Sequence, residues 1–347
     1  MITQDQKRIS SLDGLRGISI CAVMLAHAAH QFGWTQAAPR ILRYSVAIGG
    51  YLGVSVFFVI SGFLITKLLL KELEQSGTVN LKYFYRRRAV RILPASLFYI
   101  AVILLFGKAS LAQATYAITF TTTYWYDFAY KPLQQLWSLS VEEQFYLFWP
   151  VIFCFGIKYA KRYCWLIMFV SPVLRIVLRS SGTLDVSHVA PCIADILMAG
   201  CLLAIYEVPV RAFVKRHLTS GAAFSVLCVF STASGLLLIE RGWVLLWGPL
   251  AGLLAVTIAA AIERRDAILN RGPLVWIGLI SYSLYLWQQP FLCFDGPFDN
   301  FPTRICLTFA AAFASYALIE QPALKIFALK GTETRLKESR NPCITDS

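Results

Sequence analysis

Charged residues are scarce in this sequence. Only 15% of its 347 residues are Asp, Glu, Lys or Arg, whereas 57% are hydrophobic and the mean hydropathy is +0.60. Soluble domains carry about 25% charged residues, so the composition excludes a chain that folds entirely in water. The apolar residues gather in runs that approach the ~20 residues needed to cross a ~30 Å hydrocarbon core as a helix. We therefore expect an all-α, polytopic membrane protein.

The chain also lacks the signals of several other protein classes. The N-terminus, MITQDQKRIS, has no short apolar segment with a small-residue cleavage site, so we expect the first helix to serve as the targeting signal. The nine cysteines form no C-x-x-C pair, which indicates neither a disulfide framework nor a metal site. No G-x-G-x-x-G, Walker or G-x-S-x-G motif is present. The net charge of +13 fits membrane topology, and no nucleic-acid partner is expected.

Hydropathy and the positive-inside rule together predict about ten transmembrane helices. The expected spans are residues 17–33, 50–70, 91–107, 137–157, 165–180, 190–206, 220–239, 243–262, 274–294 and 303–320. A further stretch, residues 111–126, is shorter and rich in threonine. If it does not cross, 24 of the 32 lysines and arginines fall on the side of the N-terminus. Both termini are then cytoplasmic, and residues 108–136 form an outer loop.

The domain organisation follows from this count. Residues 1–330 are expected to form one membrane domain, and residues 331–347 a polar cytoplasmic tail. The spans leave no room for a fused soluble catalytic domain, so any chemistry is expected within the bundle or at its mouths. No internal repeat of the transporter kind is visible.

The first expected helix carries two ionisable residues on one face, with Arg16 near its inner end. Arg16 and His27 are separated by eleven residues, which rise ~16 Å along a helix and complete about three turns. An ionisable side chain within a span costs roughly 2.5–3.5 kcal/mol, so each is a candidate for function. The structural alternative for His27 is a packed or hydrogen-bonded histidine. His30 lies near the outer rim and is a minor alternative.

The fourth span begins with WSLSVEEQFY and places three polar side chains on one face. Ser138, Glu142 and Tyr146 recur every four residues, whereas Glu143 points to a different face. From the span boundaries, Glu142 and His27 differ by roughly 7 Å in depth, so we expect them to share one cavity. The structural alternative for Glu142 is a hydrogen bond between helices.

A run of arginines precedes the third span, in YFYRRRAVRILP. Arg86, Arg87, Arg88 and Arg91 fit a topology anchor or a site for anionic lipid headgroups. Arginine also binds phosphate through two parallel hydrogen bonds, which suits a nucleotide-bearing donor such as coenzyme A. Asp195, in PCIADILMAG, is an isolated acid that is either structural or part of the cavity.

These motifs together resemble the acyltransferase 3 family of bacterial integral-membrane acyltransferases, over nearly the whole chain. The segment GYLGVSVFFVISGFLIT looks like the family's second-helix signature, and SYALIEQP resembles its closing motif. The residues that match the family's motifs are Arg16 and His27 in the first helix, Arg88 and Arg91 in R-x-x-R, Ser138, Glu142 and Tyr146 in S-x-x-x-E-x-x-x-Y, and Glu320 in the closing motif.

The resemblance implies a ten-helix fold with both termini inside and an acyltransferase activity. Members of the family O-acylate surface polysaccharides, lipopolysaccharide, Nod factors, peptidoglycan and some macrolides. The chain departs from the family at Gln288 in SYSLYLWQQP, where a histidine is common. It is also expected to lack the extracytoplasmic esterase-like domain fused to some members, and so to complete transfer alone or with a separate partner.

The resulting hypothesis is O-acylation across the bacterial inner (cytoplasmic) membrane. An acetyl-type group passes from a cytoplasmic acyl-CoA, such as acetyl-CoA, to a hydroxyl of a lipid-linked or exported glycan. The protein uses acyl-CoA as a co-substrate, contacts membrane lipids and holds no permanent cofactor. In catalysis, His27 is expected to act as general base or as a transient acyl carrier, with Glu142 as the partner of its imidazole. Arg16, Arg88 and Arg91 are expected to bind the donor. Ser138 and Tyr146 are expected to bind or support the substrate.

One alternative function belongs to a different class. A membrane transporter or flippase also places His, Glu and Arg within its spans, where they form a proton or ion relay.

Overall fold

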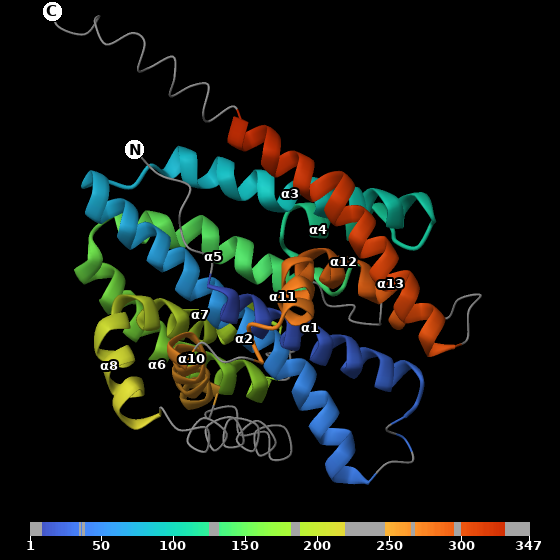
Figure 1. Cartoon of the computed structure of the whole chain (residues 1–347), viewed down its shortest axis with the longest axis horizontal. Coiled ribbons are helices and arrows are strands. Elements are labelled where there is room, and N and C mark those ends of the chain that lie inside the picture. Colours follow the sequence, from blue (N-terminus) through green and yellow to red (C-terminus); the bar gives the residue numbers. More distant parts are fainter. Residues whose placement is uncertain are drawn as a thin grey trace, which may run out of the picture.

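The computed structural model describes residues 9–34, 36, 39–124, 132–181, 188–218, 247–264, 268–294 and 300–329. These residues form helices and no strands, which confirms the all-α prediction for this part of the chain. The helices pack side by side as a bundle (Figure 1). They are α1 (Ser10–Gln31), α2 (Arg40–Ser76), α3 (Leu81–Leu105), α4 (Leu111–Ile118), α5 (Leu136–Cys154), α6 (Ile157–Ser181), α7 (Ala190–Ile205), α8 (Glu207–His217), α10 (Trp247–Arg264), α11 (Gly272–Leu279), α12 (Ser281–Leu292) and α13 (Phe301–Ser315).

Several helices are long and apolar enough to cross a membrane. The four that meet this description are Ser10–Gln31, Ser45–Ser76, Leu81–Leu105 and Phe301–Leu329. A fifth crossing arises if α7 and α8, which meet at an angle of 87°, form one broken span. The chain is therefore a multi-pass membrane protein. The other expected spans coincide with shorter or more polar helices, except that residues 220–239 lie outside the described residues, and the ten-span topology stays a prediction.

The described part of the threonine-rich stretch, residues 111–124, contains no helix long enough to cross. α4 has eight residues, which rise ~12 Å, and a 3-10 turn follows at Thr122–Tyr124. A capping box begins α4. The Ser110 hydroxyl accepts from the backbone N–H of Gln113, and the Gln113 side-chain oxygen accepts from the backbone N–H of Ser110. This short helix agrees with the interpretation of residues 108–136 as a loop.

The expected span 274–294 is two helices and not one. α11 ends at Leu279 and α12 begins at Ser281. Gly278 lies against the backbone of α1, where an added Cβ would collide with the carbonyl oxygen of Asp13. Hydropathy cannot distinguish a continuous apolar helix from a broken one. The break matters for function because α12 carries several residues that line the cavity described below.

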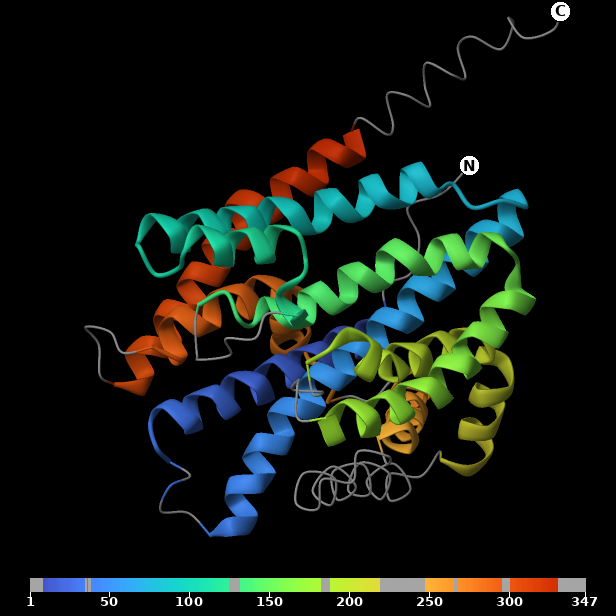
Figure 2. The ribbon, with the colours of Figure 1, turned by 180° about the vertical axis from the view of Figure 1, so that it is seen from behind.

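Close approach of α2 and α7 organises the middle of the bundle. A Cβ on Gly62 would overlap the carbonyl oxygen of Leu197, and a Cβ on Gly200 would overlap that of Val59. Small residues allow helix backbones to approach closely in membranes, where van der Waals packing drives association. The view from behind shows α2 crossing the bundle between α1 and α7 (Figure 2). α2 also contacts α5, where the Trp149 indole donates to the Thr66 hydroxyl at 2.9 Å.

A buried ion pair joins α6 to α7. The guanidinium of Arg175 binds the carboxylate of Asp195, and both side chains are fully buried. Asp195 is not among the residues that line the main cavity. The sequence left open whether Asp195 is structural or part of the cavity. Its ion pair with Arg175 shows that Asp195 is structural.

The helix that follows α13 changes its winding next to the cavity. Residues Tyr316–Glu320 form a π-helical turn, and the backbone then continues as α-helix to Leu329. Single π turns inside helices are rare and occur frequently at functional sites. Glu320 is buried and accepts a hydrogen bond from the Ser283 hydroxyl of α12 at 3.1 Å.

Candidate functional site

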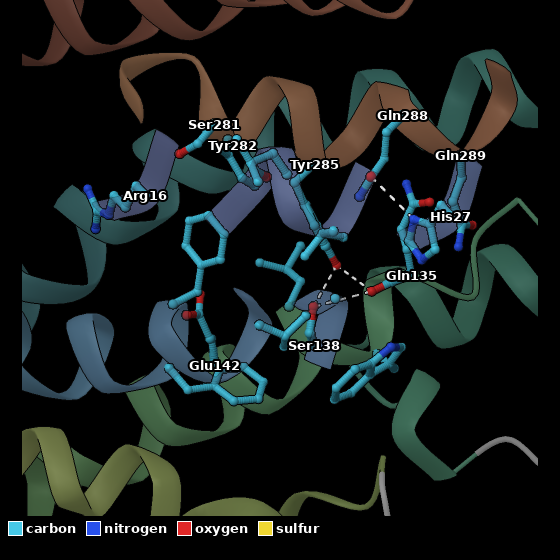
Figure 3. Close-up of a pocket in the computed structure, with 18 of the residues that line it drawn as sticks. Arg16, His27, Gln135, Ser138, Glu142, Ser281, Tyr282, Tyr285, Gln288 and Gln289 are labelled. Atoms are coloured by element: carbon cyan, nitrogen blue, oxygen red, sulfur yellow. Dashed lines mark hydrogen bonds between the residues drawn. The ribbon is translucent and has the colours of Figure 1, made fainter. Parts of the chain in front are cut away.

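A single cavity of about 660 Å³ collects the candidate residues of the sequence. Its walls come from α1, α2, α3, α5 and α12, with Glu320 from the π turn. Figure 3 shows side chains from these helices converging on it. The seven residues to which the sequence hypothesis gave a role in catalysis or binding all line this cavity, namely Arg16, His27, Arg88, Arg91, Ser138, Glu142 and Tyr146.

One end of the cavity is charged. The Arg88 guanidinium lies over the Tyr146 ring, with its central carbon 3.9 Å from the ring centroid. The Tyr146 hydroxyl donates to the Glu142 carboxylate at 3.3 Å and also hydrogen-bonds the Ser61 hydroxyl. Arg16, half-buried in α1, acts electrostatically on Glu142 together with Arg88. We call Arg16, Arg88, Arg91, Glu142 and Tyr146 the charged end.

The arginine run divides into two parts. Arg88 and Arg91 line the cavity, and Arg91 lies near enough to Glu320 for the two charges to interact. Arg86 and Arg87 are exposed and are not among the lining residues. Of these four arginines, only Arg88 and Arg91 are therefore placed to contact a ligand in the cavity.

His27 lies toward the other end, beside a residue where this chain departs from the family pattern. Its Nδ1 is 3.3 Å from Oε1 of Gln288, on α12. A neutral imidazole donates from one nitrogen and accepts at the other. Because an amide oxygen can only accept, donation from Nδ1 leaves the lone pair of Nε2 free. His30 also lines the cavity and is exposed.

Uncharged hydrogen-bonding groups surround His27. The Ser138 hydroxyl donates to the Tyr285 hydroxyl at 3.1 Å, and Tyr285 in turn donates to the backbone carbonyl of Gln135. The side-chain amide of Gln135 donates to the Tyr99 hydroxyl at 3.0 Å and to a backbone carbonyl of α12 at 2.7 Å. We call His27, Gln135, Ser138, Tyr285, Gln288 and Gln289 the amide end.

The expected pairing of His27 with Glu142 is not what the structure has. Figure 3 places the two side chains toward opposite ends of the cavity. Glu142 contacts Tyr146, and His27 contacts Gln288. Depth along the helices predicted that both reach one cavity, but it carried no information on their separation across that cavity. Glu142 lines the cavity, and Glu143 is not among its lining residues.

Most of the amide end was not predicted from the sequence. Gln135, Tyr285 and Gln289 were not candidates, because they carry no charge at neutral pH. Their signal was the presence of carboxamide and phenol groups within apolar spans, where an unpaired polar group is costly. The departure at Gln288 was noted, and the structure gives that position a direct contact with His27.

Comparison with known sequences identifies the family. The sequence model of the acyltransferase 3 family, described as an acyltransferase domain, matches residues 9–319. This chain belongs to that family. The acyltransferase 3 chain is also 31% identical to the O-acetyltransferase OatA of Staphylococcus aureus, over 94% of its own length and 60% of the relative. It is 29% identical to the peptidoglycan O-acetyltransferase OatA of Listeria monocytogenes, over 92% of its own length and 56% of the relative.

A third relative gives the same picture. The acyltransferase 3 chain is 29% identical to the putative peptidoglycan O-acetyltransferase YrhL of Bacillus subtilis, with 92% of this chain and 55% of the relative covered. The chain thus spans slightly more than half the length of the curated relatives it matches. No solved structure matches this chain.

Proposed function

We propose that this acyltransferase 3 protein is an O-acetyltransferase of the bacterial cytoplasmic membrane. It transfers an acetyl-type group from a cytoplasmic acyl-CoA to a hydroxyl of an exported or cell-surface glycan. The observation that carries the proposal is the division of one cavity into a cationic end and an end with a histidine base. The relatives named above add support, since two of them are named for acetylation of peptidoglycan.

The charged end suits the donor. Acyl-CoA carries several phosphates, and arginine binds phosphate through a planar pair of N–H groups. Arg16, Arg88 and Arg91 lie toward the ends of α1 and α3 that the positive-inside rule assigns to the cytoplasm. A cavity of about 660 Å³ holds a ligand of drug size, so the nucleotide stays at the mouth while the thioester arm enters.

The amide end suits the chemical step. His27 Nε2 removes the proton of the acceptor hydroxyl as its oxygen attacks the thioester carbonyl. The carbon–sulfur bond then breaks, and the coenzyme A thiolate leaves and takes up the proton. Gln288 fixes the imidazole tautomer by accepting from Nδ1. Glu142 orients Tyr146 and Arg88 at the charged end. This role differs from the one expected from the sequence, in which Glu142 was the partner of His27.

The topology that this proposal requires has ten spans with both termini in the cytoplasm. Reporter fusions test it without any assay of activity. A reporter at Asp127 should report a periplasmic location, and a reporter at Lys161 a cytoplasmic one. A cytoplasmic report from Asp127 would reverse the assignment of the charged end and remove the basis for donor binding there.

Purified protein tests the reaction itself. Incubation with acetyl-CoA labelled in the acetyl group should release coenzyme A and transfer the label to a glycan acceptor. Protein reconstituted into vesicles distinguishes acyl transfer from the alternative function of a transporter or flippase. Unmodified acetyl-CoA or glycan that accumulates in the lumen without thioester cleavage would contradict the acyltransferase proposal.

A further inference from the structure

Three glutamines at the amide end have buried amide atoms without a hydrogen-bond partner in the described part of the chain. These atoms are Oε1 of Gln135, Nε2 of Gln288 and Oε1 of Gln289. The three side chains are 4%, 0% and 8% exposed, respectively, and all three line the cavity. A buried polar atom without a partner costs about 1–3 kcal/mol, so each one requires an explanation.

The orientation of the Gln135 amide is fixed by its other atom, and that of Gln288 follows from the tautomer of His27. Gln135 Nε2 donates to the backbone carbonyl of Leu286 at 2.7 Å, and a carbonyl cannot donate in return. Exchange of the oxygen and nitrogen of Gln135 would therefore break this bond. Gln288 Oε1 lies 3.3 Å from His27 Nδ1; when Nδ1 carries the imidazole proton, the amide oxygen accepts from it, and Nε2 of Gln288 is the unpaired donor. The unpaired atoms consequently comprise two acceptors, one on Gln135 and one on Gln289, and one donor on Gln288.

A glutamine outside the cavity behaves differently. Gln144, on the same helix as Ser138, donates from Nε2 to the Phe120 carbonyl at 2.8 Å and accepts at Oε1 from the Tyr124 hydroxyl at 3.0 Å. Both of its amide atoms are paired. Unpaired buried amide atoms are thus found at Gln135, Gln288 and Gln289 and not at Gln144.

These unpaired atoms define the chemistry of an occupant. Gln135, Gln288, Gln289, Ser138 and Tyr285 carry no formal charge, so the site offers no counter-charge to an anion or a cation. Two acceptors match two hydroxyl groups of a ligand, and one donor matches a ring oxygen or a carbonyl. A neutral ligand with several hydroxyl groups meets this requirement, whereas phosphates are better held by the arginines of the charged end.

An aromatic wall adjoins these groups. The Trp137 indole lines the cavity and meets the ring of His188 edge to face, with the ring centroids 4.5 Å apart. Ligand sites commonly combine apolar and aromatic walls with a few placed polar groups. A sugar ring presents hydroxyl groups at its edge and C–H groups on its faces, so it fits both parts.

We propose that Gln135, Gln288 and Gln289 form an acceptor subsite, which binds an uncharged sugar ring by its hydroxyl groups beside His27. The proposal rests on the proposed function, because it assigns the acceptor of the same reaction. It adds the residues that select that acceptor and predicts that they act on the glycan and not on the acyl-CoA.

The main test is Gln289→Met, which keeps the side-chain volume and removes the amide. The donor is acetyl-CoA, and the acceptor is a tetrasaccharide of N-acetylglucosamine. The KM for the tetrasaccharide should rise at least about tenfold, equivalent to about 1.4 kcal/mol of binding free energy. The KM for the tetrasaccharide should rise by more than the KM for acetyl-CoA. The thermal midpoint should not fall, since the variant loses an unpaired buried atom.

Gln144→Met is the matched control. It removes two existing hydrogen bonds outside the cavity, so it should lower the thermal midpoint and leave the KM for the tetrasaccharide unchanged. An unchanged KM in folded Gln289→Met would overturn the subsite. If that variant does not fold, Gln289→Asn keeps the amide but shortens its reach, and the same rise in KM is required of it.

Direct binding separates this proposal from the proposed function. Stabilisation of the wild type by the tetrasaccharide alone, followed as a thermal shift, requires no acyl transfer. Loss of the shift in Gln289→Met supports the subsite even if acetyl-CoA is not cleaved, and that result would reject only the acyltransferase mechanism. A full shift in the variant would reject the subsite even if transfer proceeds normally.

Discussion

The two ends of the cavity use different chemistry although the same helices line both. α1 supplies Arg16 to the charged end and His27 to the amide end, and α5 supplies Glu142 and Ser138 in the same way. Helix periodicity explains how one helix serves both, because each pair lies on one face. The comparison suggests a division of work in which the charged end holds the donor and the amide end holds the acceptor and the base.

The largest effect should come from His27, since the amide end contains the proposed base. His27→Ala should lower acyl transfer by about 10²–10⁴-fold, the usual contribution of a general base. Steady-state transfer from labelled acetyl-CoA by purified protein measures it, with thermal stability as the check on folding. His30→Ala is the control and should keep most of the activity. Wild-type turnover in His27→Ala would move the base elsewhere and remove the proposed division.

Arg88 should give the next largest effect, and on the donor alone. Arg88→Ala should lower kcat/KM for acetyl-CoA by about 10–100-fold, because a charged hydrogen bond contributes roughly 1.5–3 kcal/mol. Arg88→Lys should restore part of this loss, since lysine lacks the planar fork. Arg87→Ala, at an exposed position outside the cavity, is the matched control and should stay near wild type. Complete rescue by lysine would favour a lipid anchor over a phosphate site.

Glu142 tests whether the two ends are independent. Glu142→Gln should reduce kcat/KM for acetyl-CoA by about tenfold, because it weakens the carboxylate that accepts from Tyr146 and faces Arg88 and Arg16. The acid limb of the pH profile, which reports the base, should keep its midpoint. A shifted midpoint would instead mean that Glu142 acts on His27 across the cavity. Glu143→Gln, at a carboxylate that is not among the lining residues, is the control.

The smallest effect should come from the position where the chain departs from its family. Gln288→His should keep transfer at neutral and higher pH within about threefold, because a neutral imidazole also accepts from His27 Nδ1. The acid limb of its pH profile should become steeper, since protonation of the imidazole at position 27 or at position 288 then breaks the hydrogen bond between them. The pH dependence of kcat/KM measures this. Gln288→Leu should lose activity at every pH, and an identical profile for all three proteins would contradict the contact.

The sequence predicted the charged end better than the amide end, for a physical reason. Arginine and glutamate are so costly within a membrane span that most of them stand out against the apolar background. Periodicity then correctly placed Ser138, Glu142 and Tyr146 on one face of α5. Glutamine is common at span ends and in loops, so Gln135 and Gln289 gave no comparable signal.

The lateral distances between helices and the positions of helix breaks also could not be predicted from the sequence. Depth along a helix follows from residue counts, but the gap between His27 and Glu142 depends on how α1, α5 and α12 pack. The break between α11 and α12 has no hydropathy signature, because Ile280 and its neighbours are as apolar as a continuous span. Arg175 was overlooked as a buried charge because it lies near the end of an expected span.

The π turn that carries Glu320 has a consequence for the biogenesis of the protein. Glu320 lines the same cavity as Arg91 and lies near enough for the two charges to interact, yet it lies near the end of the last described helix. At about 5–20 residues per second, the ribosome completes Glu320 roughly 10–50 s after Arg91. Of the residues that line the cavity, Glu320 is thus the last to be synthesised. The cavity wall beside Arg91 is therefore incomplete throughout that interval.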